Sequence, residues 1–388
     1  MIRKRKKYDE NHKLKVAMIG HKRIPSREGG VEVVVEEIST RLVRLGHEVT
    51  AFNRKGNHVS GKEFNIQDIE NIKKEYKGIE IKSIPTIDIK GISALISSCF
   101  ATIMALLGKF DCIHYHAEGP AAMLILPHLL GKKTIVTIHG LDWKRAKWNK
   151  IAVRYLKLGE KIAAKYADSV IVLSKNMQEY FKEVYGRDTI LIPNGIEKPE
   201  IKYPKVINNK WNLKKDEYIL YLGRIVPEKG LDYLIDAFSM VTTSKKLIIA
   251  GGSSDTDEFM ESVKRKAQKD ERIIFTGFVE GEVLQELFSN AYIYVLPSDL
   301  EGMPISLLEA MSYSNCCLVS DIDECVEVIE DVGVTFKKSD VADLRDKLQL
   351  LCNNYEEVKK YKDKSSGFIC NKYNWNKVVN KTIEVYKS

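Results

Sequence analysis

The stretch YILYLGRIVPEKG, residues 218–230, contains the pattern that decides the fold. Its first eight residues are a candidate strand, and we expect a helix to begin near Gly230. Arg224 lies at the end of this strand and Lys229 just before the helix, at the edge where ligands of open α/β sheets bind. Two cations beside the free N–H groups of a helix start suit a multiply charged anion such as a diphosphate. The alternative is a solvated basic loop.

The same alternation of β-rich runs and helical patterns extends over almost the whole chain. Runs that are apolar on both faces and separated by helices predict parallel sheets with right-handed crossovers. We therefore predict an α/β protein with two doubly wound, Rossmann-like domains facing each other across a cleft. The other candidate strands lie at residues 15–20, 48–53, 79–86, 111–117, 134–140, 169–174 and 189–195, and then at 246–252, 272–279, 292–299, 316–322 and 333–336.

The 388 residues suit two domains of similar size. We predict a disordered basic leader at 1–14, a first domain at 15–196, a polar linker at 197–217 and a second domain at 218–370. For residues 371–388 we predict a final amphipathic helix. The sequence leaves open which domain this helix contacts, and packing back on the N-terminal domain is one alternative.

Composition is typical of a globular protein, with 44% apolar and 29% charged residues. Seven cysteines without a C-x-x-C pair argue against a disulfide framework or a zinc site and favour the reducing cytoplasm. The most apolar stretch, residues 92–107, is too short to cross a bilayer, so we expect a buried or surface-docking helix. The start of the chain has no apolar run typical of a secretory signal.

The net charge is +8, and residues 1–15 carry seven Lys or Arg against Asp9 and Glu10. This cluster is either a solvated leader or a segment attracted to anionic lipid. No nucleic-acid-binding motif accompanies it, so we expect no nucleic-acid partner. We predict a cytoplasmic protein that can associate with the inner face of the plasma membrane.

A second informative stretch is LPSDLEGMPISLLEAMSYS, residues 296–314. A strand leads into a turn at Glu301 and Gly302, and Pro304 is a favourable first-turn residue of a helix. Gly302 lets a ligand approach the backbone, and the helix start offers N–H groups to phosphate. Glu301 and Glu309 cannot share a helix face, so we expect them to contact different parts of one extended ligand. The alternative is a helix-dipole carboxylate and a solvated one.

Together these motifs resemble the retaining glycosyltransferases of family four, which have the GT-B fold. Glu301 and Glu309 match the family's E-x₇-E spacing, and the similarity covers nearly the whole chain after about residue 14. The resemblance implies transfer of a hexose or deoxyhexose from a nucleotide-diphosphate sugar to a glycan or lipid-linked acceptor in cell-surface polysaccharide synthesis. First-domain segments that resemble the polysaccharide-synthesis branch, which includes rhamnosyltransferases, are IPSREGGVE (24–32), TIHGLDWKRAKW (137–148), VLS (172–174) and IPNGI (192–196).

The resemblance also implies roles for residues of the second domain. Arg224 and Lys229 would hold the donor diphosphate, Glu309 the ribose hydroxyls and Glu301 a hydroxyl of the transferred sugar. Backbone groups would support diphosphate and sugar at Gly302, Met303 and Pro304. The chain departs from the family at Ser314-Asn315, where Gly is frequent, and this affects the end of the helix more than the chemistry.

In the first domain, the resemblance implies that His139 lies near the reacting sugar carbon and that Gly29 and Gly30 form a loop closing over phosphate or acceptor. It implies no cofactor and no bound metal. His114 and His116 alternate along a strand without a carboxylate or cysteine partner at a ligand spacing. The D-x-D at 321–323 is interpreted as a loop.

We assign the acceptor site to first-domain loops at 54–64, 88–92 and 141–149. Trp143 and Trp148 either stack on a sugar, contact a lipid headgroup or pack against the following helix. Two other functions stay open: a nucleotide-sugar epimerase of GT-B-like fold, and a non-catalytic subunit that binds a sugar nucleotide.

Overall fold

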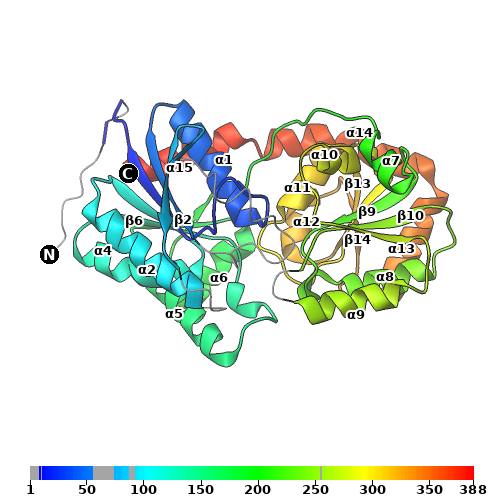
Figure 1. Cartoon of the computed structure of the whole chain (residues 1–388), viewed down its shortest axis with the longest axis horizontal. Coiled ribbons are helices and arrows are strands. Elements are labelled where there is room, and N and C mark those ends of the chain that lie inside the picture. The colour runs from blue at the N-terminus through cyan, green and yellow to red at the C-terminus, as the bar shows by residue number, and fades with distance from the viewer. Residues whose placement is uncertain (1–7, 10, 56–73, 87–91, 254–255) are drawn as a thin grey trace. The chain divides into compact units, whose positions relative to one another are not determined.

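The computed structural model describes residues 8–9, 11–55, 74–86, 92–253 and 256–388. It divides into two compact units (Figure 1). The first unit comprises Met1–Gly195 and Trp375–Ser388, and the second comprises Ile196–Asn374. None of the described helices is long and apolar enough to cross a membrane.

The first unit is built on an eight-stranded sheet with the order β3-β4-β2-β1-β5-β6-β7-β8. All neighbouring strands are parallel except β3 and β4, which are antiparallel. The central strands are buried on both faces, as the continuous apolar runs predict. The strands are β1 (Lys15–Ile19), β2 (Glu48–Arg54), β3 (Glu75–Tyr76), β4 (Ile79–Ile84), β5 (Cys112–His116), β6 (Lys133–Ile138), β7 (Ser169–Val172) and β8 (Ile190–Leu191).

Helices cover both faces of this sheet, with α1 and α15 on one side and α2, α4 and α5 on the other (Figure 1). Side-chain caps begin two of them, since Asn149 accepts from the Ala152 N–H and Ser174 from the Met177 N–H. The helices are α1 (Gly30–Arg44), α2 (Ile92–Leu107), α3 (Glu118–Ala121), η2 (Ala122–Leu124), α4 (Ile125–Leu129), η3 (Asp142–Lys144), α5 (Lys150–Tyr166), α6 (Lys175–Tyr185) and α15 (Trp375–Lys387).

The second unit has a six-stranded, fully parallel sheet with the order β11-β10-β9-β12-β13-β14. Its strands are β9 (Tyr218–Leu222), β10 (Lys246–Ala250), β11 (Ile273–Gly277), β12 (Ile293–Leu296), β13 (Cys316–Ser320) and β14 (Val334–Phe336). Its helices are α7 (Val206–Trp211), η4 (Pro227–Lys229), α8 (Leu231–Ser239), α9 (Asp257–Ala267), α10 (Gly281–Asn290), α11 (Ile305–Ser312), α12 (Asp323–Ile329), α13 (Val341–Asn353) and α14 (Tyr355–Lys372).

The first unit ends at Gly195, one residue before the predicted end of the first domain. The expected linker, 197–217, contains α7 and lies within the second unit. The final helix lies in the first unit, where the Arg41 guanidinium stands 5.3 Å from the Trp375 ring centroid. Tyr386 of this helix also contacts the sheet, because its hydroxyl is 2.7 Å from His114 Nδ1.

Part of the leader predicted to be disordered instead packs on the first unit. Leu14 is fully buried, and the Tyr8 ring stacks on His12 with centroids 4.3 Å apart. His12 in turn lies 3.3 Å from the Asp111 carboxylate. An apolar side chain and two aromatic rings thus anchor the segment despite its basic composition. Residues 1–7 and 10 lie outside the described residues.

Candidate active site

The loop after β9 carries the two cations singled out in the sequence. The sequence pattern places Arg224 at the end of the strand, but β9 already ends at Leu222. The chain then turns away, with the Tyr221 hydroxyl donating to the Arg224 carbonyl at 2.9 Å. Lys229 ends the short helix η4, directly before Gly230 and α8. Both residues therefore lie at the carboxyl end of the central strand.

Gly230 adopts φ +65°, in the left-handed region. A Cβ atom at this position would collide with the Pro297 carbonyl oxygen and the Tyr233 hydroxyl. Glycine therefore lets the loop that contains Lys229 approach the loop after β12 closely.

The structure brings Lys229 and Glu301 together from these two loops. Their side chains form an ion pair and are only 12% and 8% exposed. The Ser298 hydroxyl donates to the same Glu301 carboxylate oxygen at 2.6 Å. A cation and a carboxylate are thus held side by side at the ends of β9 and β12.

Further hydrogen bonds fix the two loops to each other. The Asp299 N–H donates to the Glu228 carbonyl at 2.9 Å, and the Tyr233 hydroxyl donates to the Asp299 carboxylate at 2.9 Å. The Ser339 hydroxyl donates to the same Asp299 oxygen at 2.8 Å. Since these bonds join four separate segments, the position of the Lys229–Glu301 pair is built into the second unit.

Helix α11 follows this pair directly. Pro304 occupies its N-cap position, and the helix covers Ile305–Ser312, slightly shorter than the sequence pattern predicts. Met303 is buried, whereas Gly302 is partly exposed just before the helix. Glu309 is partly exposed in the second turn, about 6 Å further along the axis than Ile305. Glu301 and Glu309 therefore lie on either side of the helix start, as their spacing predicts.

In the first unit, His139 directly follows β6. Its Nε2 is 3.0 Å from Nδ1 of the buried His116, and their rings stack with centroids 5.2 Å apart. Loss of hydration lowers the pKa of His139 to about 4, so the imidazole is neutral at pH 7. It offers a hydrogen-bonding group and no fixed positive charge.

Gly29 and Gly30 lie at the start of α1, where Gly29 is the N-cap residue in an extended conformation. The buried Glu32 carboxylate accepts from the Lys22 N–H at 2.9 Å and lies against Gly29. Although burial raises it, the charge and the N–H of Lys22 hold the pKa of Glu32 below its usual value. An ionised Glu32 thus ties the loop after β1 to the start of α1.

Sequence reasoning missed two buried glutamates of the first unit that hold the predicted acceptor loop, 141–149. Glu118 accepts from the Asp142 N–H at 3.0 Å, and burial followed by the Asp142 charge raises its pKa well above the usual range. Glu160 accepts from the Trp143 indole at 2.9 Å. Glu118 directly follows a predicted strand, and this position was the signal that could have identified it.

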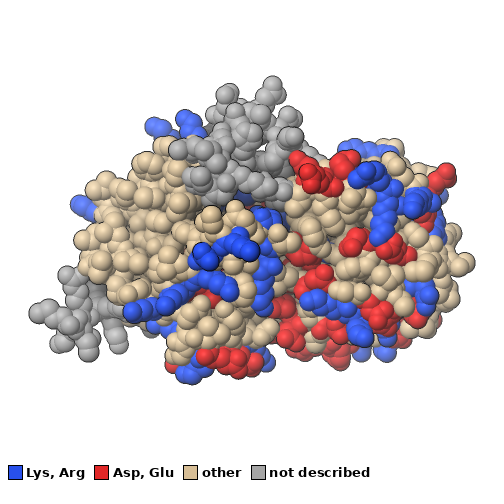
Figure 2. Space-filling model, turned by 90° about the horizontal axis from the view of Figure 1, so that it is seen from below, with Lys and Arg blue, Asp and Glu red and all other residues tan. Residues whose placement is uncertain are grey.

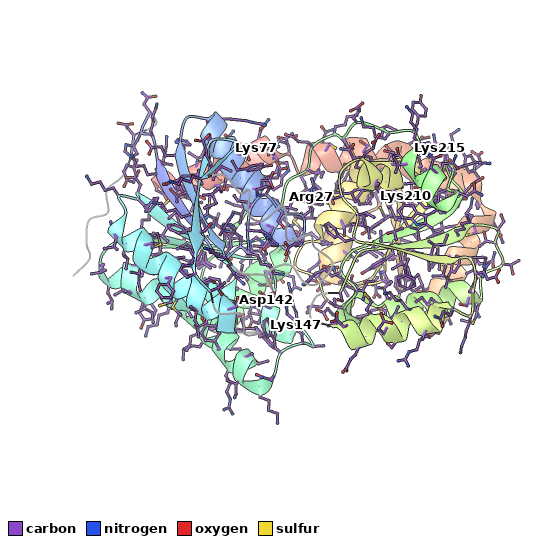
Figure 3. All side chains as sticks on the ribbon, in the orientation of Figure 1. Arg27, Lys77, Asp142, Lys147, Lys210 and Lys215 are labelled. Atoms are coloured by element: carbon purple, nitrogen blue, oxygen red, sulfur yellow. The ribbon has the colours of Figure 1, made fainter. Side chains whose placement is uncertain are left out.

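Trp143 packs against the first unit's core, and its ring lies 4.1 Å from Lys157 Nζ. This geometry favours the packing alternative for Trp143. Asp142 and Lys147 lie in the same loop (Figure 3). The acceptor segments 56–64 and 88–91 lie outside the described residues.

Within the described ranges, no group of three His, Cys, Asp or Glu side chains could hold a metal ion. Asp321 instead accepts from the Lys338 N–H at 2.8 Å.

Comparisons with known proteins match both units. The family model described as "Glycosyl transferases group 1" matches residues 205–368, and the model "Glycosyltransferase Family 4" matches residues 28–198. An uncharacterised glycosyltransferase of Methanocaldococcus jannaschii is 24% identical over 96% of this chain and 98% of its own length. A UDP-Gal:α-D-GlcNAc-diphosphoundecaprenol α-1,3-galactosyltransferase of Escherichia coli is 27% identical over 60% of this chain and 64% of its own.

Among solved structures, Anabaena HepE in complex with UDP and glucose superposes with a TM-score of 0.78, covering 96% of this chain and 98% of that one at 14% identity. At this identity the likeness establishes the fold alone.

Proposed function

We propose, from the premise that the chain belongs to the family 4 glycosyltransferases and has their GT-B fold, that it transfers a hexose or deoxyhexose from a nucleotide-diphosphate sugar with retention of the anomeric configuration. The acceptor is a glycan or a lipid-linked sugar in cell-surface polysaccharide synthesis. The observation that carries the proposal is the Lys229–Glu301 pair, which two strand-end loops hold beside the start of α11.

The donor diphosphate is assigned to the second unit. Lys229, Arg224 and the N–H groups at the start of α11 provide positive charge where a diphosphate needs it. Glu301 sits against Lys229, so a donor that engages the cation brings its sugar within reach of the carboxylate. Carboxylates accept hydrogen bonds from hydroxyl groups, and we assign Glu301 to the transferred sugar and Glu309 to the ribose. The backbone of Gly302, Met303 and Pro304 supports the diphosphate and the sugar.

The reaction requires loss of a nucleotide diphosphate from the anomeric carbon. Negative charge grows on the leaving oxygen, and fixed donors placed there each contribute about 10²–10³ in rate. We propose attack from the face that the leaving group departs from, with the leaving phosphate taking the acceptor proton. This route needs neither a protein nucleophile nor a metal. The family resemblance assigns the neutral His139 to the sugar, and Gly29 with Gly30 to phosphate or acceptor.

The names of similar proteins support the substrate classes. The Anabaena structure contains UDP and glucose, and the Escherichia coli relative is named for transfer from UDP-galactose to a diphosphoundecaprenol-linked sugar. A nucleotide-sugar donor and a lipid-linked acceptor are therefore the first combination to test. A cytoplasmic enzyme at the inner face of the plasma membrane fits such an acceptor.

The test screens UDP-, GDP- and dTDP-sugars by thermal shift and then assays transfer with the donor that stabilises the protein most. We expect transfer to acceptor with the anomeric configuration kept, as read by NMR of the product. Lys229→Ala is expected to lower turnover about 10²–10³-fold, whereas the exposed Lys337→Ala serves as the control. A new sugar isomer from donor alone would identify an epimerase, and donor binding without turnover a non-catalytic subunit.

A further inference from the structure

Helix α2 presents four large apolar side chains to solvent, whereas its fully buried side chains are small or hydroxyl-bearing. Leu107 is 84% exposed, and Phe100, Ile103 and Met104 are 39–48% exposed. The four positions follow helical spacing and therefore form one stripe. The buried side of the same helix consists of Ser97, Ser98, Ala101, Thr102 and Ala105. An ordinary surface helix instead buries most of its large apolar side chains, as Leu106 of this helix is packed against the core.

The inward polar groups are satisfied, so the orientation is a stable one. The Thr102 hydroxyl donates to the Ser98 carbonyl at 2.7 Å and lies 3.0 Å from the Tyr115 hydroxyl. The Ser98 hydroxyl donates to the Ala94 carbonyl at 2.7 Å. Burying a hydroxyl that has such hydrogen-bond partners costs little free energy of folding. The exposed stripe is thus a consequence of how the helix packs, and burial within this unit does not account for the four large side chains in it.

Helix α4 extends the exposed apolar surface. Its Leu126 and Leu129, together with the adjacent Leu130, are 47%, 69% and 58% exposed. Both α2 and α4 contact η2, and both lie on the same side of the first unit's sheet (Figure 1). We call the set Phe100, Ile103, Met104, Leu107, Leu126, Leu129 and Leu130 the apolar face. Large apolar side chains gathered on one side of a protein mark interaction sites.

The exposed charged residues of α5, which packs against α4, are all basic. Helices α2 and α4 contain no Asp, Glu, Lys or Arg. Helix α5 has one acidic residue, Glu160, which is fully buried. Its exposed charged residues are Lys150, Arg154, Lys157, Lys161 and Lys165, which we call the basic row. Figure 2 shows a broad uncharged area on the first unit, bordered by Lys and Arg side chains.

We propose that the apolar face and the basic row together dock this chain on an anionic lipid bilayer. Apolar side chains that enter the headgroup region and cations that contact anionic lipids are the two contributions that hold proteins at a membrane surface. Helix α2 lies flat in this mode, because its small face remains packed on the sheet. A second copy of the chain fits less well, since a two-fold contact would bring the two basic rows near each other.

The test measures sedimentation of the full chain with vesicles of phosphatidylcholine, alone or mixed with phosphatidylglycerol. We expect binding to the mixed vesicles that weakens as salt is raised. Ile103→Ser with Leu107→Ser is expected to weaken binding about tenfold or more. Lys161→Gln with Lys165→Gln is expected to weaken it about fivefold for each charge removed. These side chains are exposed, and unchanged melting temperatures verify folding.

Matched controls come from the second unit. Leu350→Ser removes a side chain that is 54% exposed on α13, and Lys210→Gln with Lys215→Gln removes two cations (Figure 3). Both controls are expected to bind vesicles like the wild type. Residues 1–7 are identical in every variant, so the differences report on the apolar face and the basic row.

Three outcomes overturn the proposal. The first is a wild-type chain that binds neither vesicle, or binds both equally. The second is unchanged binding of the apolar-face and basic-row variants. The third is a lipid-free dimer, seen by sedimentation velocity, that Ile103→Ser with Leu107→Ser dissociates, because this result assigns the face to a second copy. No donor or acceptor is present, so failure here leaves the proposed transfer activity untouched.

Discussion

Replacing Lys229 by methionine separates the structural role of its ion pair from a catalytic one. Lys229 and Glu301 are 12% and 8% exposed, so the substitution leaves a nearly buried carboxylate without its cation. Loss of one partner of a fully buried pair typically costs about 3–5 kcal/mol. The Ser298 hydroxyl still donates to Glu301, and some exposure remains, so we expect a loss of about 2–4 kcal/mol in the free energy of unfolding.

The double variant Lys229→Met with Glu301→Gln removes both charges. Because no unpaired charge stays buried, we expect it to regain most of the lost stability, leaving about 1 kcal/mol or less. Transfer activity is expected to stay about 10²–10³-fold below the wild type in the single and the double variant, because the cation is absent from both. Stability thus recovers while activity does not.

The assay combines urea unfolding with initial rates of sugar transfer. Lys264→Met provides the control, because Lys264 forms an exposed pair with Glu261 at 3.2 Å on α9, with side chains 39% and 61% exposed. We expect that control to change stability by less than about 1 kcal/mol and activity not at all. Recovery of activity in the double variant would refute the reasoning, since it would show that the pair only holds the two loops together.

Three more predictions test other parts of the structure. Glu309→Ala is expected to weaken nucleotide binding, measured by calorimetry, more than it lowers the rate at saturating donor. Gly230→Ala is expected to destabilise the protein more than Gly281→Ala does, as measured by urea unfolding. Both glycines have positive φ, which costs about 1–2 kcal/mol for alanine. Only the alanine at position 230 would also collide with Tyr233 and Pro297. Loss of hydration lowers the pKa of His114 to about 3, below its value of about 6.5 in the unfolded chain. The contribution of the neutral His114 to stability is therefore complete near pH 7 and is lost as pH falls through about 6.5 towards 3. His114→Gln is expected to show a shallower fall in melting temperature between pH 7 and pH 5 than the wild type, and an identical fall would contradict this.

The sequence predicts the parallel sheets well, because their buried strands are continuous apolar runs between helical patterns. It also marks Lys229 and Glu301 as separate candidates. It cannot show that they form an ion pair, since 72 residues separate them and the contact depends on the packing of two loops. Strand β3 was missed because two residues, Glu75 and Tyr76, carry no periodic pattern.

Residues 92–107 show a different limit of sequence reasoning. The pattern located the helix, but composition left open whether it is buried or docks on a surface. The answer depends on which side faces the sheet, and here the smaller side chains Ala101 and Ala105 fill the space next to the strands. A helix without charged residues has no polar face to identify its exposed side. Which side of this helix faces the sheet is therefore determined by packing and cannot be predicted from its composition.

The geometry of the second unit has a consequence for how donor binding and transfer are related. The contacts that position Lys229 and Glu301, from Tyr233 to Asp299 and from Asp299 to Glu228, all lie within that unit. A preorganised pair loses little conformational entropy when a ligand engages it. Nucleotide affinity is therefore expected to depend on the second unit. Substitution of His139 in the first unit is expected to lower transfer while leaving nucleotide affinity nearly unchanged. Calorimetry with the nucleoside diphosphate on His139→Ala, beside its transfer rate, tests this division, and a matching loss of affinity would contradict it.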